Sequence, residues 1–269
     1  MKKKINFSKK WIIVTGAARG LGKEMTKHLI ITEGARVIAV DVKEELLQDL
    51  AKEMNEYVQN SVIPITADLS SEDEIRRVFK DITEKYSIFG LVNNAGVTHY
   101  GAAESTFIDF YQKMFEINFL AAMKLSLLFI DHFKEKGEGC ILNITSLGGI
   151  IPIAYQNIYS ASKHALQSFS QALYEELKGT GIDICIYAPG GINTSMIKES
   201  GLSDHFGSSQ FGILDSRIVA VKAINSMKKK RDFATSSFFD YLSVSFCKIV
   251  PGKITRRFLS GLYKPMFDV

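Results

Sequence analysis

The sequence predicts a doubly wound α/β fold, in which a parallel sheet carries helices on both faces. Short runs rich in β-branched residues alternate along the chain with longer segments of helical periodicity, and this alternation is typical of right-handed βαβ units. A glycine-rich turn, "TGAARGLG", stands between the first run and the first helical segment. No interior linker, low-complexity tract or repeat interrupts the pattern, so we expect a single domain over residues 1–269.

The first two strand–helix pairs follow directly from the residue pattern. "WIIVTG" at 11–16 predicts a strand, and the helical segment 21–34 after it ends at Gly34, a common helix terminator. "ARVIAVD" at 35–41 predicts the second strand and leads into an amphipathic helix over 43–58.

The third pair and the fourth strand come next. "SVIPITADLS" at 61–70 predicts a strand, and the segment 71–86 predicts a helix. Ser71 and Glu74 stand three residues apart at its start, the spacing of a capping box. "FGLVNNAG" at 89–96 predicts the fourth strand.

The remaining elements repeat the alternation. A long helix is expected over about 106–132, followed by a strand, "GCILNITS", at 139–146. A further helix at 159–179 precedes the strand "IDICIYAPGG" at 182–191. Strands joined through helices in this way place all their carboxyl ends at one edge of the sheet.

Composition limits the classes of protein. The chain is 46% hydrophobic and 23% charged, an ordinary globular composition. Its net charge of +4 is too small to argue for a nucleic-acid partner. Three scattered cysteines show no metal-ligand spacing and suit a reducing compartment, so we expect a cytoplasmic protein without a metal. No apolar run reaches the length of a membrane span, and the apolar stretch near the start is too short for a signal peptide.

The glycine-rich turn predicts a phosphate site. Gly16, Gly20 and Gly22 would let the backbone turn tightly and approach a pyrophosphate, with unpaired N–H groups at the start of the following helix. The alternative is a tight strand-to-helix turn that binds nothing. Asp41 ends the next strand, where a carboxylate would meet the ribose hydroxyls of a dinucleotide.

Asp41 also bears on the choice of cofactor. A carboxylate accepts hydrogen bonds from ribose hydroxyls but repels a 2′-phosphate, which favours NAD over NADP. Arg19 is the opposing signal, since a cation in the loop could reach that phosphate. Asp41 could instead cap the helix that begins near residue 43.

The stretch "YSASK" indicates proton chemistry. On a helix, Tyr159 and Lys163 would share a face because they are four residues apart. An ammonium nearby would lower the pKa of the phenol, which could then exchange a proton with an alcohol. Ser146 ends the preceding strand at the edge where ligands bind. The alternative is a pair of residues on a helix surface.

These motifs together carry a family resemblance. "TGAARGLG", "NNAG", Asn118, Ser146, "YSASK" and "PGGINT" occur in order, and the chain resembles a short-chain dehydrogenase/reductase over about residues 9–230. The resemblance implies a Rossmann fold with seven parallel strands. It also implies a catalytic tetrad, with Asn118 holding a water behind Lys163, and the tetrad is Asn118, Ser146, Tyr159 and Lys163.

The resemblance also implies where the cofactor binds. Asp68 would contact the adenine, and Ile192 and Thr194 would contact the carboxamide. Asn118 and Asp68 have plainer alternatives, as a packed polar residue and a helix-capping acid. The predicted cofactor contacts are Gly16, Arg19, Gly20, Leu21, Gly22, Asp41, Asp68, Leu69, Asn94, Ala95, Gly96, Tyr159, Lys163, Pro189, Gly190, Ile192 and Thr194.

The predicted function is an NAD(H)-dependent oxidoreductase acting on a secondary alcohol or ketone, as a homodimer or homotetramer. One alternative is an NADPH-dependent carbonyl reductase, and another is a dinucleotide-binding regulatory protein without turnover. We expect a substrate lid over about 191–212, with an ordinary surface loop as its alternative, because this segment is rich in glycine and small polar residues.

The last segment, about 232–269, predicts a helical extension. Phe239, Leu242, Phe246, Ile249 and Val250 recur at helical spacing, and a Pro-Gly pair then separates a second stripe. From residue 222 to the end, ten cations stand against three acids. Such stripes could cover the core or a dimer partner. They could also contact a membrane peripherally, and the substrate would then be apolar or lipid-like.

Overall fold

The computed structural model describes residues 3–193 and 214–263. Its central sheet contains seven strands in the order β3-β2-β1-β4-β5-β6-β9, and every neighbouring pair is parallel. The strands are β1 Trp11–Thr15, β2 Arg36–Asp41, β3 Val62–Thr66, β4 Ile88–Asn93, β5 Gly139–Ile144, β6 Ile182–Ala188 and β9 Phe233–Thr235. The predicted doubly wound parallel sheet is confirmed.

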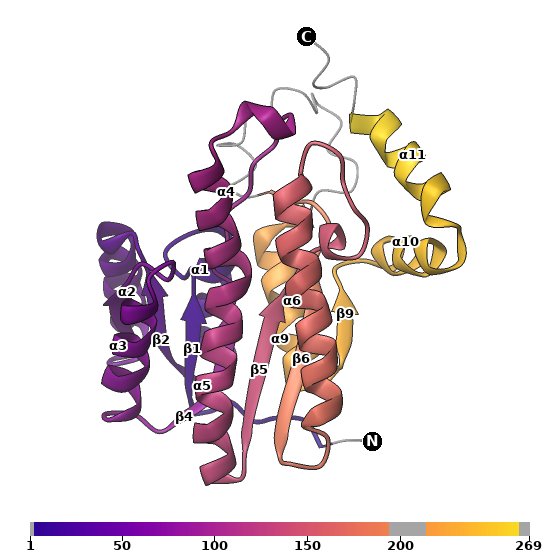
Figure 1. The fold of residues 1–269 in the computed structure, drawn as a ribbon. Coiled ribbons are helices and arrows are strands. Elements are labelled where there is room, and N and C mark those ends of the chain that lie inside the picture. The colour runs from indigo at the N-terminus through magenta and orange to yellow at the C-terminus, as the bar shows by residue number, and fades with distance from the viewer. Residues whose placement is uncertain (1–2, 194–213, 264–269) are drawn as a thin grey trace.

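Helices cover both faces of this sheet (Figure 1). Side chains of α1, α2 and α9 form one apolar cluster with the sheet, whereas those of α3, α5 and α6 form the other. The helices are α1 Gly20–Ile31, α2 Glu44–Tyr57, α3 Glu72–Thr83, α4 Ile108–Phe115, α5 Ala121–Lys136, α6 Asn157–Glu176, α9 Ser216–Lys228, α10 Phe238–Ile249 and α11 Gly252–Tyr263. No helix of the described residues has the length and apolar character to span a bilayer.

Short elements complete the chain. A 3-10 turn, η1 Ala103–Ser105, precedes α4, and another, η3 Leu147–Gly149, follows β5. A separate two-stranded pair joins β7 Ile192–Asn193 to β8 Leu214–Asp215. Between β1 and β4 the strand order reverses direction, and such a switch point is where this architecture binds ligands.

The predicted long helix over 106–132 is wrong in one respect. It is divided into α4 and α5 by a π-helical turn, η2 Glu116–Leu120, and Asn118 lies buried within that turn. The difference arises because a π-helical turn, with its i→i+5 hydrogen bonds, accommodates one extra residue within the helix. Such turns often occur at functional sites.

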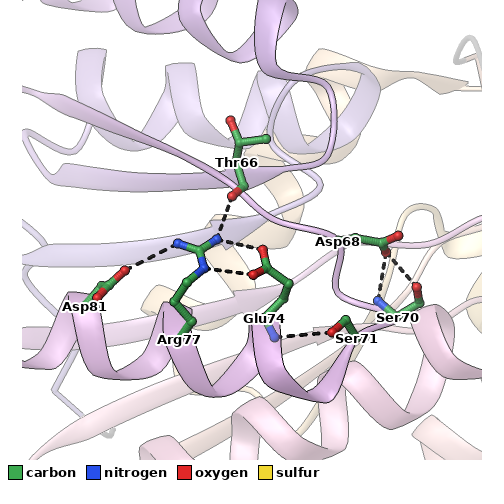
Figure 2. A network of polar contacts seen from close by, with 7 residues as sticks. All are labelled: Thr66, Asp68, Ser70, Ser71, Glu74, Arg77 and Asp81. Carbon is green, nitrogen blue, oxygen red and sulfur yellow. Dashed lines mark hydrogen bonds and ion pairs between the residues drawn. The ribbon is translucent and has the colours of Figure 1, made fainter.

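The start of α3 is fixed by a polar network beside the end of β3 (Figure 2). The Ser71 hydroxyl accepts a hydrogen bond from the Glu74 amide at 3.4 Å, so half of the predicted capping box forms. The Glu74 carboxylate pairs instead with Arg77 at 2.7 Å. Arg77 also donates to the Thr66 carbonyl at 2.9 Å, which ties the helix to the strand end that precedes Asp68.

Candidate active site

The carboxyl ends of the central strands surround one cavity of about 390 Å³. Most of the predicted site residues line it; of those that the structure describes, Gly22 and Asn118 do not. Gly22 packs behind the loop, Asn118 lies buried beside the cavity, and Thr194 falls outside the described residues together with residues 194–212 of the predicted lid. The predicted residues that line the cavity are Gly16, Arg19, Gly20, Leu21, Asp41, Asp68, Leu69, Asn94, Ala95, Gly96, Ser146, Tyr159, Lys163, Pro189, Gly190 and Ile192.

The glycine loop is shaped by close backbone contacts. Gly16 has φ +64°, a conformation that favours glycine, and a side chain at Gly22 would place its Cβ 1.9 Å from the Gly16 carbonyl oxygen. Asn94 closes the loop from the other side, because its amide donates to the Thr15 and Gly16 carbonyls at 2.9 and 3.1 Å. Helix α1 then begins at Gly20, and its N-cap residue Arg19 makes no side-chain capping hydrogen bond, which suits anion binding by the first N–H groups of the helix.

Asp41 connects this loop to the second strand. One carboxylate oxygen accepts a hydrogen bond from the Ala18 amide at 3.0 Å, and the other accepts from the Lys43 amide at 3.0 Å. The second bond lies at the start of α2, so part of the proposed helix-capping alternative is realised as well. Arg19 and Lys43 also line the cavity, which therefore presents both signs of charge near Asp41.

Asp68 lies at the cavity edge just before α3. The Ser70 hydroxyl donates to its carboxylate at 2.7 Å, and Lys113 forms an ion pair with it at 3.0 Å. Burial raises the pKa of Asp68, but these hydrogen bonds and the nearby ammonium outweigh burial, and the pKa is lowered. Asp68 is not the cap of α3, since Ser71 occupies that position.

Tyr159 and Ser146 meet inside the cavity. Tyr159 lies in the first turn of α6, and Ser146 follows β5 at the start of η3. Both hydroxyls line the cavity, and the Ser146 oxygen accepts a hydrogen bond from the Gly148 amide at 3.0 Å. Burial raises the pKa of Tyr159, and the hydrogen bond with Ser146 opposes part of that rise.

Lys163 follows one turn later on α6, and its side chain is buried. Its ammonium donates to the Ile144 carbonyl at 2.9 Å, and burial lowers its pKa to about 8. The expectation that Lys163 lowers the pKa of Tyr159 is therefore wrong for this structure. The ammonium is bound to the end of β5, and burial is the larger influence on the phenol.

Asn118 uses its side chain to join the two halves of the site. Its amide donates to the Val97 carbonyl at 2.9 Å and to the Ser162 hydroxyl at 3.1 Å, while its oxygen accepts from the Val97 amide at 2.8 Å. The π-helical turn thus connects the segment after β4 to α6. A Cβ at Gly96 would lie 3.2 Å from the Asn118 oxygen, so this position has little room for a side chain.

Comparison with known proteins identifies the architecture. Residues 10–204 match the family described as short chain dehydrogenase. The chain belongs to the short-chain dehydrogenase family. Mouse "Dehydrogenase/reductase SDR family member 7B" is 28% identical over 91% of this chain and 79% of its own length.

Two further similarities cover most of the chain. "3-ketodihydrosphingosine reductase" of Bacteroides thetaiotaomicron is 27% identical over 90% of this chain and 84% of its own length. A crystal structure of a short-chain dehydrogenase/reductase from Burkholderia phymatum in complex with NAD superposes with a TM-score of 0.81. That structure is 19% identical and covers 90% of this chain and 93% of its own, so it supports the fold.

This short-chain dehydrogenase has site residues that sequence reasoning missed. Thr98, Tyr100, Ile153 and Gln156 line the same cavity as Tyr159. The Gln156 amide donates to the Thr98 hydroxyl at 3.1 Å, and the Gln156 side chain is buried. They belong to none of the motifs, and the only available signal was the place of Gln156 directly before α6.

Proposed function

We propose that this enzyme catalyses hydride transfer between NAD(H) and a secondary alcohol or ketone with an apolar body. The observation that carries the proposal is that Ser146, Tyr159 and Lys163 line the same cavity as the glycine loop. When bound, the nicotinamide supplies the acceptor or donor of the hydride. The residues of the chain hold the cofactor, orient the substrate oxygen and move its proton.

The cofactor site fits a dinucleotide. Gly22 lies close against the Gly16 carbonyl, and the start of α1 has no side-chain cap. Both features suit a pyrophosphate at the glycine loop. Asp41 would accept hydrogen bonds from the adenosine ribose, and Asp68 would lie beside the adenine. The remaining predicted contacts, from Leu21 to Ile192, are proposed to line the cofactor along the same cavity.

NADPH is the second candidate. Arg19 and Lys43 line the cavity near Asp41, and two cations could offset the repulsion between this carboxylate and a 2′-phosphate. We favour NAD because the Asp41 carboxylate is held toward the loop by the Ala18 amide.

Proton transfer is assigned to Tyr159. With its pKa raised by burial, the phenol stays protonated at neutral pH and can donate its proton to the oxygen of a ketone as that carbon is reduced. Ser146 would donate a hydrogen bond to the same substrate oxygen. Lys163, bound to the Ile144 carbonyl, would hold the nicotinamide ribose. Asn118 would hold a water behind Lys163.

The substrate pocket is largely apolar. Val97, Leu147 and Ile153 line the cavity together with the Thr98–Gln156 pair. The similarity to a protein named for a long-chain keto lipid supports a lipid-like ketone. We further propose that the lid lies over 191–212.

The working unit is proposed to be one domain over residues 1–269. We propose that it acts in the cytoplasm as a homodimer or homotetramer. The pairing would use the helices around α5 and α6, where Leu127 is half-exposed. The C-terminal extension would make peripheral contact with a membrane.

The test is a panel of alcohols and ketones of graded chain length, assayed with NAD(H) and NADP(H). We expect long apolar ketones and NADH to give the highest kcat/KM. Tyr159→Phe keeps the ring but removes the transferable proton, so turnover should fall at least about 100-fold with NADH binding unchanged. Turnover of Tyr159→Phe close to that of the unmodified enzyme would contradict the assignment.

A further inference from the structure

Helix α10 carries its large apolar side chains on the outside of the molecule. Phe238, Phe239, Phe246 and Ile249 are 76%, 71%, 60% and 83% exposed, and Leu242 is 48% exposed. At 100° per residue these five positions fall within a single arc about 100° wide. The five residues, here called the α10 face, form one continuous apolar stripe.

The orientation of α10 is fixed from its first turn. The Ser237 hydroxyl accepts from the Asp240 amide at 3.0 Å, and the Asp240 carboxylate accepts from the Ser237 amide at 3.0 Å, a complete capping box. Val244 is buried, so the opposite side of the helix packs on the protein. Asp240 also lies against Gly190, where a Cβ would be 2.9 Å from the Asp240 oxygen. The α10 face therefore points outward because its other side is engaged.

The helical segment that carries this face is rich in cations. Between residues 238 and 263 the sequence has four cations and a single acid, Asp240. That acid is half-buried and caps the helix. Lys253 and Arg257 of α11 are exposed, and Ile254 beside them is 58% exposed. An outward apolar stripe with adjacent cations is the composition of an interfacial helix on an anionic membrane.

A second exposed apolar pair lies at the start of α4. Phe107 and Ile108, at the start of α4, are 86% and 80% exposed. Helix α4 begins at the same end of the molecule as α11, the end to which the strands of the sheet point (Figure 1). One surface could thus touch α11 and the start of α4.

We propose that the α10 face and the first turns of α11 dock on the surface of an anionic lipid bilayer. A second copy of the chain fits less well, because a two-fold contact would pair this surface with the same surface of the other copy, and cations outnumber acids on both. Acidic headgroups offer the complementary charge. The proposal does not depend on hydride transfer, since no residue of the docking surface belongs to the proposed catalytic set.

The test is co-sedimentation of the full chain with vesicles of phosphatidylcholine, with or without phosphatidylserine. The wild-type chain should bind the anionic vesicles, more weakly at high salt. The triple variant Phe239→Ser, Phe246→Ser, Ile249→Ser should bind at least about tenfold more weakly, since interfacial binding scales with buried apolar area.

A matched control carries serine at three exposed apolar positions away from the α10 face, at the ends of α1 and α2 and just after α2: Ile31, Tyr57 and Val58. It should bind like wild type, as should Tyr159→Phe, which separates docking from turnover. The variant Lys253→Glu, Arg257→Glu should lose only the binding gained with phosphatidylserine. Thermal melts check that each variant is folded.

Three results would overturn the proposal. The wild-type chain could fail to bind either vesicle, or the α10 triple variant could bind as well as the control triple. The third is a change of oligomeric state in sedimentation equilibrium for the α10 variant without a change in vesicle binding, which would assign the surface to a second copy.

Discussion

Gly22→Ala is expected to damage the cofactor site more than it damages the fold. The new Cβ would lie 1.9 Å from the Gly16 carbonyl oxygen and 2.6 Å from the Asn94 side-chain nitrogen. Ordinary contact begins near 3.4 Å, so α1 and the loop would have to separate by about 1.5 Å. Overpacking of this kind costs about 1–3 kcal/mol, which corresponds to a Tm lower by roughly 2–12 °C.

The effect of Gly22→Ala on catalysis with NADH should be larger than its effect on stability. Displacement of a binding group by about 1 Å can cost about 100-fold in catalytic efficiency, so we expect kcat/KM for NADH to fall by about that factor. The matched control is Gly137→Ala, where φ is +70° and no atom lies within 4 Å of the new Cβ. This left-handed position costs about 1–2 kcal/mol for alanine, so the control should lose similar stability while NADH binding is unchanged.

The assays are a thermal melt and a fluorescence titration with NADH for both variants. If Gly22→Ala bound NADH and turned over as wild type does, the loop would not need the close approach, and its assignment as the pyrophosphate site would fail.

Three further outcomes are expected. Asp41→Ala should raise the NADP/NAD ratio of kcat/KM, and an unmodified enzyme that already prefers NADPH would contradict the choice of NAD. Lys163→Met should reduce both turnover and NADH affinity. A loss of turnover with unchanged NADH affinity would show that Lys163 does not hold the ribose. Burial lowers the pKa of His28, His99 and His132, so the unfolded chain takes up protons first as pH falls below about 6.5. The Tm should therefore decrease between about pH 7 and pH 5, and a Tm that rose over this interval would refute the reasoning.

The sheet and the glycine loop could be predicted because their signals are local. β-Branched runs fix the strands, and the conformation of Gly16 and the packing of Gly22 require glycine. The turn at Asn118 could not be predicted, because apolar periodicity continues through residues 106–132 and does not distinguish an α turn from a π turn.

Other features depend on the tertiary structure. The spacing of Tyr159 and Lys163 places them on one side of α6, but the direction of the ammonium is set by the Ile144 carbonyl on another element. The apolar periodicity of the sequence likewise places the residues of the α10 face on one side of a helix, but it does not indicate which side packs against the rest of the protein. The Thr98–Gln156 pair joins two loops that lie far apart in sequence and carry no motif.

The π-helical turn Glu116–Leu120 sets the rotational phase between α4 and α5. Because this turn holds one residue more than an α turn, removal of one residue would restore a regular helix. Each helical residue advances the rotation by about 100°, so α4 would present a different side to α6, against which it packs. The number of residues in this segment, more than their identity, therefore determines which side of α4 faces α6. Deletion of one residue here would rotate α4 relative to α6, whereas deletion of one residue in an exposed loop is accommodated locally.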